Sequence, residues 1–159
     1  MLVVNVDIAN FSRHNLIGDL TRGGTMKPIV ACGTTEGENL FERAFGDAPY
    51  FHLYEINVEG FEFIEEIENI YREEDENQES ENKLKAKNIS SLLKAKSANV
   101  LLAHQMGPFI ANINKDFVQI ISKEKKIEPA LQSVRERLHL VEREWRKGEN
   151  REYLVLEET

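Results

Sequence analysis

The sequence has very little cysteine and no long apolar run, and each shortage excludes a class of protein. Cys32 is the single cysteine among 159 residues, so the chain can form neither an intramolecular disulfide nor a four-cysteine zinc site. No apolar stretch approaches the roughly 20 residues that a membrane-spanning helix needs. Residues 1–20 also lack the basic start and long apolar core of a signal peptide. We therefore expect a cytoplasmic protein without a membrane partner.

Basic residues are not in excess either. The chain has 28 Asp and Glu against 20 Lys and Arg, which gives a net charge of −8. A nucleic-acid surface needs clustered Lys and Arg, so this balance argues against a nucleic-acid partner, although it leaves room for a local basic groove. Hydrophobic residues make up 41% and charged residues 30%, which is typical of a globular domain.

The motifs of several common enzyme classes are missing. The sequence contains no GxSxG, no Walker loop, no dinucleotide fingerprint and no HExxH. The first long apolar strand, "PIVACGT", has no Asp, whereas a two-metal nuclease needs several convergent carboxylates. We therefore expect a protein without catalytic activity.

Hydrophobic periodicity predicts strands and helices that form a mixed sheet. The predicted elements are a strand at 28–34, a hairpin over 50–71 that turns at Glu59-Gly60, a helix at 84–98 with Leu84, Ile89, Leu92 and Leu93 on its apolar face, a strand at 99–107, a short helix from Pro108, a strand at 117–122 and a long amphipathic helix at 127–148. The alternation of helices and strands in the second half implies parallel crossovers with helices packed on the sheet.

The ends of the chain and one internal segment differ from this pattern. Residues 1–25 form an N-terminal extension that is interpreted either as a native accessory strand, over 2–8, or as an upstream addition. Residues 149–159 are interpreted as a C-terminal tail that adds a short strand beside residues 2–8. Residues 72–83 are acidic and polar, which predicts a solvated loop, and they lack the ligand spacing of an EF-hand. The main domain is expected over residues 26–148.

Two motifs resemble those of a known family. Residues Phe45–Phe51, "FGDAPYF", match an FG-x-A/C-PYF element, and Ala103–Pro108, "AHQMGP", match a buried strand that ends in a GG-M/I-GP turn. In this order they resemble the dinitrogenase iron–molybdenum cofactor biosynthesis family, which includes NifX-like proteins and the C-terminal part of NifB. His104 and Gln105 replace the glycines of the second element, and this is the clearest departure.

The resemblance implies a fold, a function and partners. The implied fold is α/β and ribonuclease H-like, with a five-stranded mixed sheet flanked by helices. The implied function is to bind or carry an iron–sulfur or molybdenum-containing cluster during cofactor assembly, between a cluster donor and an acceptor protein. The alternative is a metal-free interaction or regulatory domain of the same fold, with the acidic loop and the last helix as its working surfaces.

Candidate site residues follow from the expected strand order. Ligands of open α/β sheets bind at the carboxyl ends of parallel strands, where Cys32, His104 and Met106 would converge. A thiolate, an imidazole and a thioether suit soft metals and metal–sulfur clusters. Backbone N–H groups near Gly107 and the helix that follows would hold an anion. A cofactor-binding role for the Phe45–Tyr50 loop is implied by the resemblance alone. The full expected cofactor-binding set is Cys32, Gly33, Thr34, Thr35, Phe45, Gly46, Pro49, Tyr50, Gln105, Gly107 and Pro108.

Each candidate metal ligand also has a structural interpretation. Cys32 and Met106 are residue types that commonly fill cores. A histidine at a strand end, such as His104, is more often a polar partner of backbone groups than a metal ligand. We favour closure of the site for the His104 side chain alone, and ligand binding for the cleft as a whole. His52, which alternates with Tyr54 on its strand, is expected at the surface.

Overall fold

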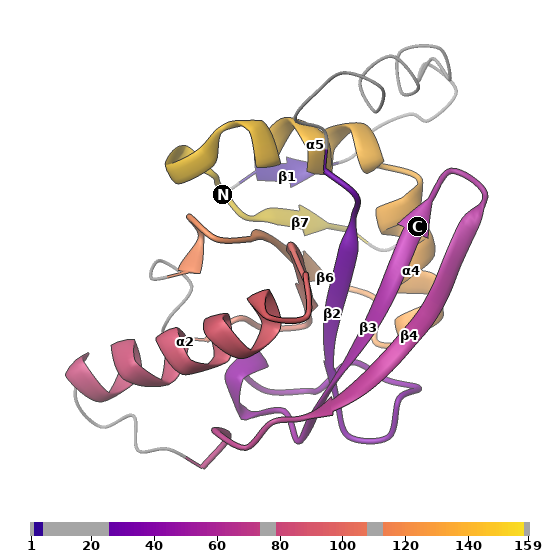
Figure 1. Ribbon diagram of the computed structural model, residues 1–159. Coiled ribbons are helices and arrows are strands. Elements are labelled where there is room, and N and C mark those ends of the chain that lie inside the picture. Colours follow the sequence, from indigo (N-terminus) through magenta and orange to yellow (C-terminus); the bar gives the residue numbers. More distant parts are fainter. Residues whose placement is uncertain (1, 5–25, 74–78, 108–112, 158–159) are drawn as a thin grey trace.

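A computed structural model of the chain describes residues 2–4, 26–73, 79–107 and 113–157 (Figure 1). They form one mixed sheet with helices on both faces, which confirms the α/β class. The strands are β1 (Leu2–Val4), β2 (Ile29–Thr34), β3 (Tyr50–Asn57), β4 (Gly60–Glu68), β5 (Val100–Ala103), β6 (Val118–Ser122) and β7 (Leu154–Leu156). The helices are α2 (Glu79–Lys94), α4 (Ile127–Arg135) and α5 (Leu138–Arg146), with 3₁₀ turns η2 (Phe45–Asp47) and η3 (Gly148–Asn150).

The sheet has seven strands in the order β1-β7-β6-β5-β2-β3-β4, and the first five of these are mutually parallel. β3 and β4 add an antiparallel hairpin in which Asn57 pairs with Gly60, as predicted. The expected count of five was too low. It matches β2 to β6, and the sheet continues because β7 pairs with the free side of β6 and buries its three residues Leu154–Leu156. β1 then pairs with β7, which confirms the predicted contact between the two ends of the chain.

Two apolar cores lie on the two faces of the sheet. Successive side chains of a strand point to opposite faces. Val30 and Cys32 of β2 therefore join the core beneath α4 and α5, whereas Ala31 joins the core beneath α2. β5 is divided in the same way. Because both faces are covered, these two strands are continuous apolar runs, as expected for central parallel strands.

The long helix predicted over 127–148 is two helices. Arg137, between α4 and α5, has φ −128° and ψ 29°, which is outside helical geometry. α4 packs against β4 and α5 packs against β6. The prediction of one helix rested on an apolar period that continues through both helices. The break at Arg137 lets each short helix pack on a different part of the twisted sheet.

Helix α2 begins at Glu79, earlier than predicted. The prediction of a solvated loop over 72–83 was therefore wrong for residues 79–83. Ile89 and Leu93 are fully buried as expected, but Leu84 is 55% exposed and Lys85 is buried in its place. The Lys85 ammonium lies inside because it donates to Asp47 Oδ1 at 2.5 Å and to the carbonyl of Arg72 at 2.9 Å. A paired charge is tolerated in a core where an unpaired one is not.

Some predictions fall on residues that the structure does not describe. These are most of the N-terminal extension, the short helix that starts at Pro108, and residues 74–78 of the acidic segment. The division into an extension, a main domain over 26–148 and a tail stays a prediction. Among the helices in the described ranges, none combines the length and apolarity that crossing a bilayer requires.

Candidate ligand-binding cleft

The carboxyl ends of β2, β5 and β6 meet at one edge of the sheet. β2 and β5 are parallel neighbours with Cys32 opposite Leu102, and β5 and β6 are parallel neighbours with Ala103 opposite Ile121. The expectation that the first and fourth predicted strands lie side by side is therefore confirmed. In open α/β sheets this edge is where ligands bind.

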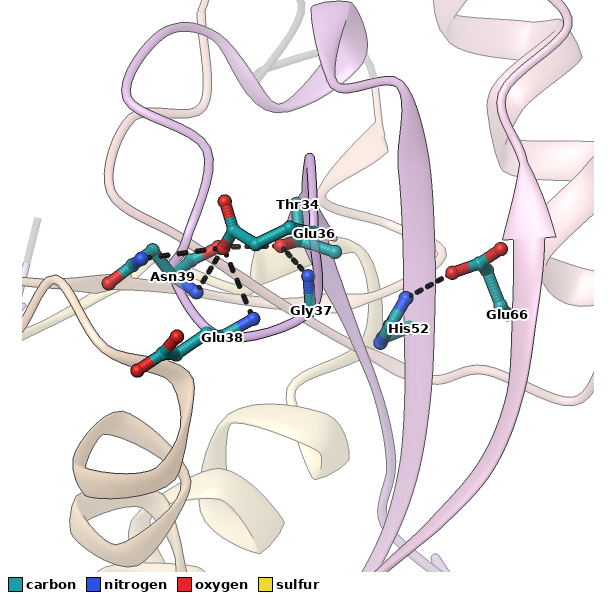
Figure 2. Close-up of polar contacts among 7 residues, drawn as sticks. All are labelled: Thr34, Glu36, Gly37, Glu38, Asn39, His52 and Glu66. Carbon is teal, nitrogen blue, oxygen red and sulfur yellow. Dashed lines mark hydrogen bonds and ion pairs between the residues drawn. The ribbon is translucent and has the colours of Figure 1, made fainter.

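The loop that follows β2 is held in a defined shape by its own side chains (Figure 2). The Thr34 hydroxyl donates to the Asn39 carbonyl at 2.6 Å and accepts from the Gly37 N–H at 2.9 Å. Glu36 Oε1 accepts from the backbone N–H groups of Glu38 at 3.2 Å and Asn39 at 2.7 Å. These bonds satisfy backbone N–H and C=O groups of the loop, so the loop has a fixed conformation at this edge of the sheet.

The His52 ring packs against this loop at Gly37. Gly37 has φ +91°, and a Cβ placed on it would lie 2.6 Å from His52 Cε1. His52 is 9% exposed, and its Nε2 lies 2.8 Å from Glu66 Oε2 on β4 (Figure 2). The expected surface position of His52 was therefore wrong. The loop folds back over the β3 side chain, and strand alternation does not reveal such a cover.

Backbone bonds connect the same loop to the segment after β6. Leu40 N–H donates to the Lys125 carbonyl at 2.7 Å, and Ile127 N–H donates to the Glu38 carbonyl at 2.9 Å. The second bond satisfies an N–H group in the first turn of α4, where no side chain caps the helix. Lys125 is thereby held beside the β2 loop.

His104 lies just after β5 and contacts β6. Its Nδ1 is 3.1 Å from the Ser122 carbonyl oxygen. A carbonyl only accepts hydrogen bonds, so Nδ1 carries the proton, and in the neutral ring Nε2 keeps its lone pair. A backbone carbonyl on one ring nitrogen is the usual arrangement that orients a histidine whose other nitrogen binds a metal.

The Phe45–Phe51 and Ala103–Pro108 motifs contact each other in the fold. Phe45 N–H donates to the Gln105 carbonyl at 2.9 Å, and Gln105 Nε2 donates to the Glu42 carbonyl at 3.2 Å. Gly107 has φ +87°, and a Cβ on it would lie 2.6 Å from Ala44 Cβ. Glycine is therefore required there by both conformation and space.

The Phe45–Phe51 loop is itself fixed by the core. The Phe45 and Phe51 rings are fully buried and stack with centroids 4.8 Å apart. The buried Asn69 amide donates to the carbonyls of Gly46 at 2.8 Å and Ala48 at 2.9 Å. The loop therefore shapes the site, but its aromatic rings do not line it.

A cleft of about 670 Å³ opens between these segments. Its lining residues are Thr35, Glu36, Asn39, Leu40, Phe41, Glu42, Arg43, His104, Gln105 and Lys125. A second hollow of about 400 Å³ shares Thr35, Phe41 and Arg43 with it and adds Asp47, Pro49, Arg72 and Glu73. The basic groups at the cleft are Arg43 and Lys125. Glu36 already accepts three hydrogen bonds within its loop.

The three predicted metal ligands do not converge. Cys32 is fully buried in the α4/α5 core, and Met106, 2% exposed, is buried in the α2 core. Burial raises the pKa of the Cys32 thiol, which keeps it protonated and disfavours the thiolate that a metal needs. The sheet therefore separates Cys32 from Met106, and of this set His104 alone lines the cleft.

The other predicted cofactor-binding residues divide by position. Thr35 and Gln105 line the main cleft, and Pro49 lines the adjoining hollow. Gly33, Thr34, Phe45 and Gly46 are buried, Tyr50 and Gly107 are half-buried, and Pro108 lies outside the described residues. Gly33 permits close approach, since a Cβ there would lie 3.0 Å from Ala48 Cβ. Most of these residues therefore pack beneath the residues that line the cleft and do not line it themselves.

Arg43 and Lys125 were missed as candidates. Arg43 is the one basic residue in the segment "TEGENLFERAFGDAP", and Lys125 belongs to "SKEKK", directly after a buried strand. Both follow strands whose carboxyl ends face the same edge, and this was the available signal.

The fold defines an α/β domain with an open cleft at the carboxyl ends of its parallel strands. In the described ranges no group of three or more His, Cys, Asp or Glu is placed to hold a metal ion. A protein-family model described as "Dinitrogenase iron-molybdenum cofactor" matches residues 26–137, which is most of the chain. The chain belongs to this family, and the resemblance of the two motifs is confirmed. No match was found among curated proteins.

Proposed function

We propose that the protein is a non-catalytic carrier that binds a metal–sulfur cluster, iron–sulfur or molybdenum-containing, in the cleft at the ends of β2, β5 and β6. The observation that carries this proposal is the position of the cleft. Every residue that lines it falls within the segment matched by the dinitrogenase iron–molybdenum cofactor family, at the contact between the two motifs.

The cleft offers charge and one nitrogen ligand. Arg43 and Lys125 would neutralise an anionic cluster, and the Nε2 lone pair of His104 would supply a single protein ligand. A cargo held by few ligands is released readily, which suits transfer from a donor protein to an acceptor protein. With Cys32 protonated in the core, attachment does not depend on a thiolate.

The proposal contains no chemical step on a substrate. The site offers Glu36, whose Oε1 is occupied by loop hydrogen bonds, the exposed Glu42, and His104, whose Nδ1 is bonded to a carbonyl. We propose the cytoplasm as the compartment because a single cysteine cannot form an intramolecular disulfide.

Anaerobic loading tests the proposal. The protein is mixed with iron and sulfide, or with tetrathiomolybdate, and bound cluster is measured by absorption and elemental analysis after gel filtration. We expect Arg43→Ala/Lys125→Ala to bind about fivefold more weakly, since two exposed charge contacts are lost. His104→Ala should alter the spectrum of the bound cluster. Cys32→Ser should load like wild type, and so should Lys87→Ala, which removes an exposed charge from α2.

Failure takes two forms. If wild type binds nothing under any of these conditions, the carrier function is wrong. If the cleft variants load as well as the controls, the cluster binds elsewhere.

A metal-free interaction domain is the second candidate, and the burial of Cys32 and Met106 favours it. With both sulfur atoms in the cores, the cleft has fewer soft ligands than expected. This candidate predicts no loading together with retention of protein partners by the apoprotein.

A further inference from the structure

Strand β4 forms an open edge of the sheet. It is last in the strand order, and in the part of the chain that the structure describes no strand pairs with its outer side (Figure 1). It runs over nine residues, Gly60–Glu68, whereas a typical strand has about 5 or 6. An exposed edge presents N–H and C=O groups that another strand can pair with, so a long edge requires either protection or a partner.

Two large apolar side chains lie exposed in the middle of this edge. Phe63 is 49% exposed and Ile64 is 43% exposed. The Phe63 ring lies on the α4/α5 side, with its centroid 5.1 Å from that of His52 and 5.6 Å from that of Tyr54. Ile64 has no residue opposite it, because the register shifts between Leu53 and Tyr54 and makes Ile64 the bulged position. The pair offers apolar contact to a strand laid alongside.

The edge is acidic along its whole length. β4 contains four glutamates and no basic residue. Glu62 and Glu65 share the α2 side of the sheet, as their pairing with Glu55 and Leu53 shows. Glu65 contacts Lys96 at 3.5 Å, in an exposed ion pair.

These charges decide which occupant the edge favours. Two copies paired through β4 would bring four further glutamates to the interface, while the Lys96 that each copy adds is already paired with its own Glu65, and like charges on paired strands are destabilising. A basic strand would instead gain cross-strand ion pairs and be attracted over a distance.

We propose that the β4 edge binds an extended basic segment of a partner protein by strand addition. Its Lys or Arg side chains lie opposite Glu62 and Glu65 on the α2 side, and an apolar side chain covers Phe63 on the other. Main-chain hydrogen bonds supply affinity and the alternating side chains supply specificity. This surface is separate from the cleft, and the inference does not depend on cluster binding.

A peptide experiment on the full chain tests the proposal. The probe is an octapeptide of alternating Lys and Val, with a Glu/Val octapeptide and a Lys/Val octapeptide N-methylated at alternate residues as controls. Fluorescence anisotropy measures binding, and amide hydrogen exchange measures protection of residues 60–68. We expect the Lys/Val peptide to bind and slow exchange in β4, the Glu/Val peptide not to bind, and the N-methylated peptide to bind at least tenfold more weakly because it cannot complete the ladder.

Charge reversal adds a matched comparison. Glu62→Lys/Glu65→Lys should weaken Lys/Val binding about tenfold and should newly bind the Glu/Val peptide. Glu149→Lys/Glu157→Lys makes the same change of net charge at exposed positions beside β7, at the other end of the sheet, and should change binding less than twofold. Phe63→Ser should weaken binding while it keeps every charge.

Several results would overturn the proposal. If the N-methylated peptide binds as tightly as the Lys/Val peptide, or if both double variants weaken binding of the Lys/Val peptide equally, the attraction is non-specific. Absence of peptide binding would mean that the glutamates only protect the edge. A dimer that protects β4 would assign the edge to a second copy. Cluster loading of the edge variants is a separate readout and stays at the wild-type level if the cleft is the cargo site.

Discussion

Replacing Gly107 with alanine should destabilise the protein more than the same change at Gly60 or Gly148. Gly107 follows β5, where the Ala103–Pro108 motif contacts the Phe45–Phe51 loop. Two penalties coincide at this position. The φ of +87° is unfavourable for a residue with a Cβ, and that Cβ would lie 2.6 Å from Ala44 Cβ, closer than real Cβ contacts allow.

The magnitude follows from the two penalties. A left-handed backbone costs a non-glycine residue about 1–2 kcal/mol. Forcing an extra methyl group into a packed contact typically costs about 1–3 kcal/mol more. We therefore expect Gly107→Ala to lower the free energy of unfolding by about 2–5 kcal/mol, a large fraction of the ~5–15 kcal/mol that holds a domain together.

Two other glycines separate the penalties. Gly148 has φ +60° with open space around it, so Gly148→Ala should show the conformational cost alone, about 1–2 kcal/mol. Gly60 lies on β4 with neither a positive φ nor a neighbour within 4 Å, so Gly60→Ala should change stability by no more than about 0.5 kcal/mol.

Urea denaturation, followed by circular dichroism, measures all three variants. The double variant Gly107→Ala/Ala44→Gly removes the colliding methyl group and should recover the packing part of the loss, so the two changes should be non-additive by about 1 kcal/mol or more. The reasoning fails if Gly107→Ala costs no more than Gly148→Ala, or if the changes at 44 and 107 simply add.

Three further predictions test the buried groups. Burial, followed by the nearby Glu128 carboxylate, raises the pKa of Tyr54 to about 12, above the usual value of about 10. The unfolded chain releases this proton first, so stability should fall as pH rises from about 10 to 12, and Tyr54→Phe should flatten that fall in urea titrations. The buried Cys32 thiol should react with a disulfide reagent only as fast as the protein unfolds, and rapid labelling of the native state would contradict its burial. Asp47→Asn weakens the bond to the buried Lys85 ammonium and should cost about 2 kcal/mol in thermal or urea unfolding, and a loss below about 0.5 kcal/mol would show that this contact is not needed.

Much of the fold could be predicted from local patterns. The hairpin at Glu59-Gly60, the buried strands around Val30 and Leu102, and the contact between the two chain ends were predicted and are present. Each rests on short-range alternation or apolar runs, which local burial dictates. The break at Arg137 was missed because the apolar period continues across it, and only the shape of the sheet requires two helices.

The site was predicted in outline but not in its side chains. The edge where strand ends meet was correctly expected, and Thr35, His104 and Gln105 line the cleft there. Cys32 was misplaced because it lies within β2, two residues before the strand ends, where both faces are still covered. Position along a strand decides whether a side chain faces a core or the opening beyond it.

The sequence by itself determined the class of the domain and the motifs that place it in its family. Composition, strand and helix periods, and the Phe45–Phe51 and Ala103–Pro108 motifs are local properties, and they persist whatever the chain packs against. Only the tertiary structure decided which groups share a space. It placed Cys32 and Met106 in different cores, joined Arg43, His104 and Lys125 at one cleft, and left β4 as an acidic edge. The reason is that strand order and the covering of each face arise from contacts between residues far apart in the chain, which no local pattern encodes.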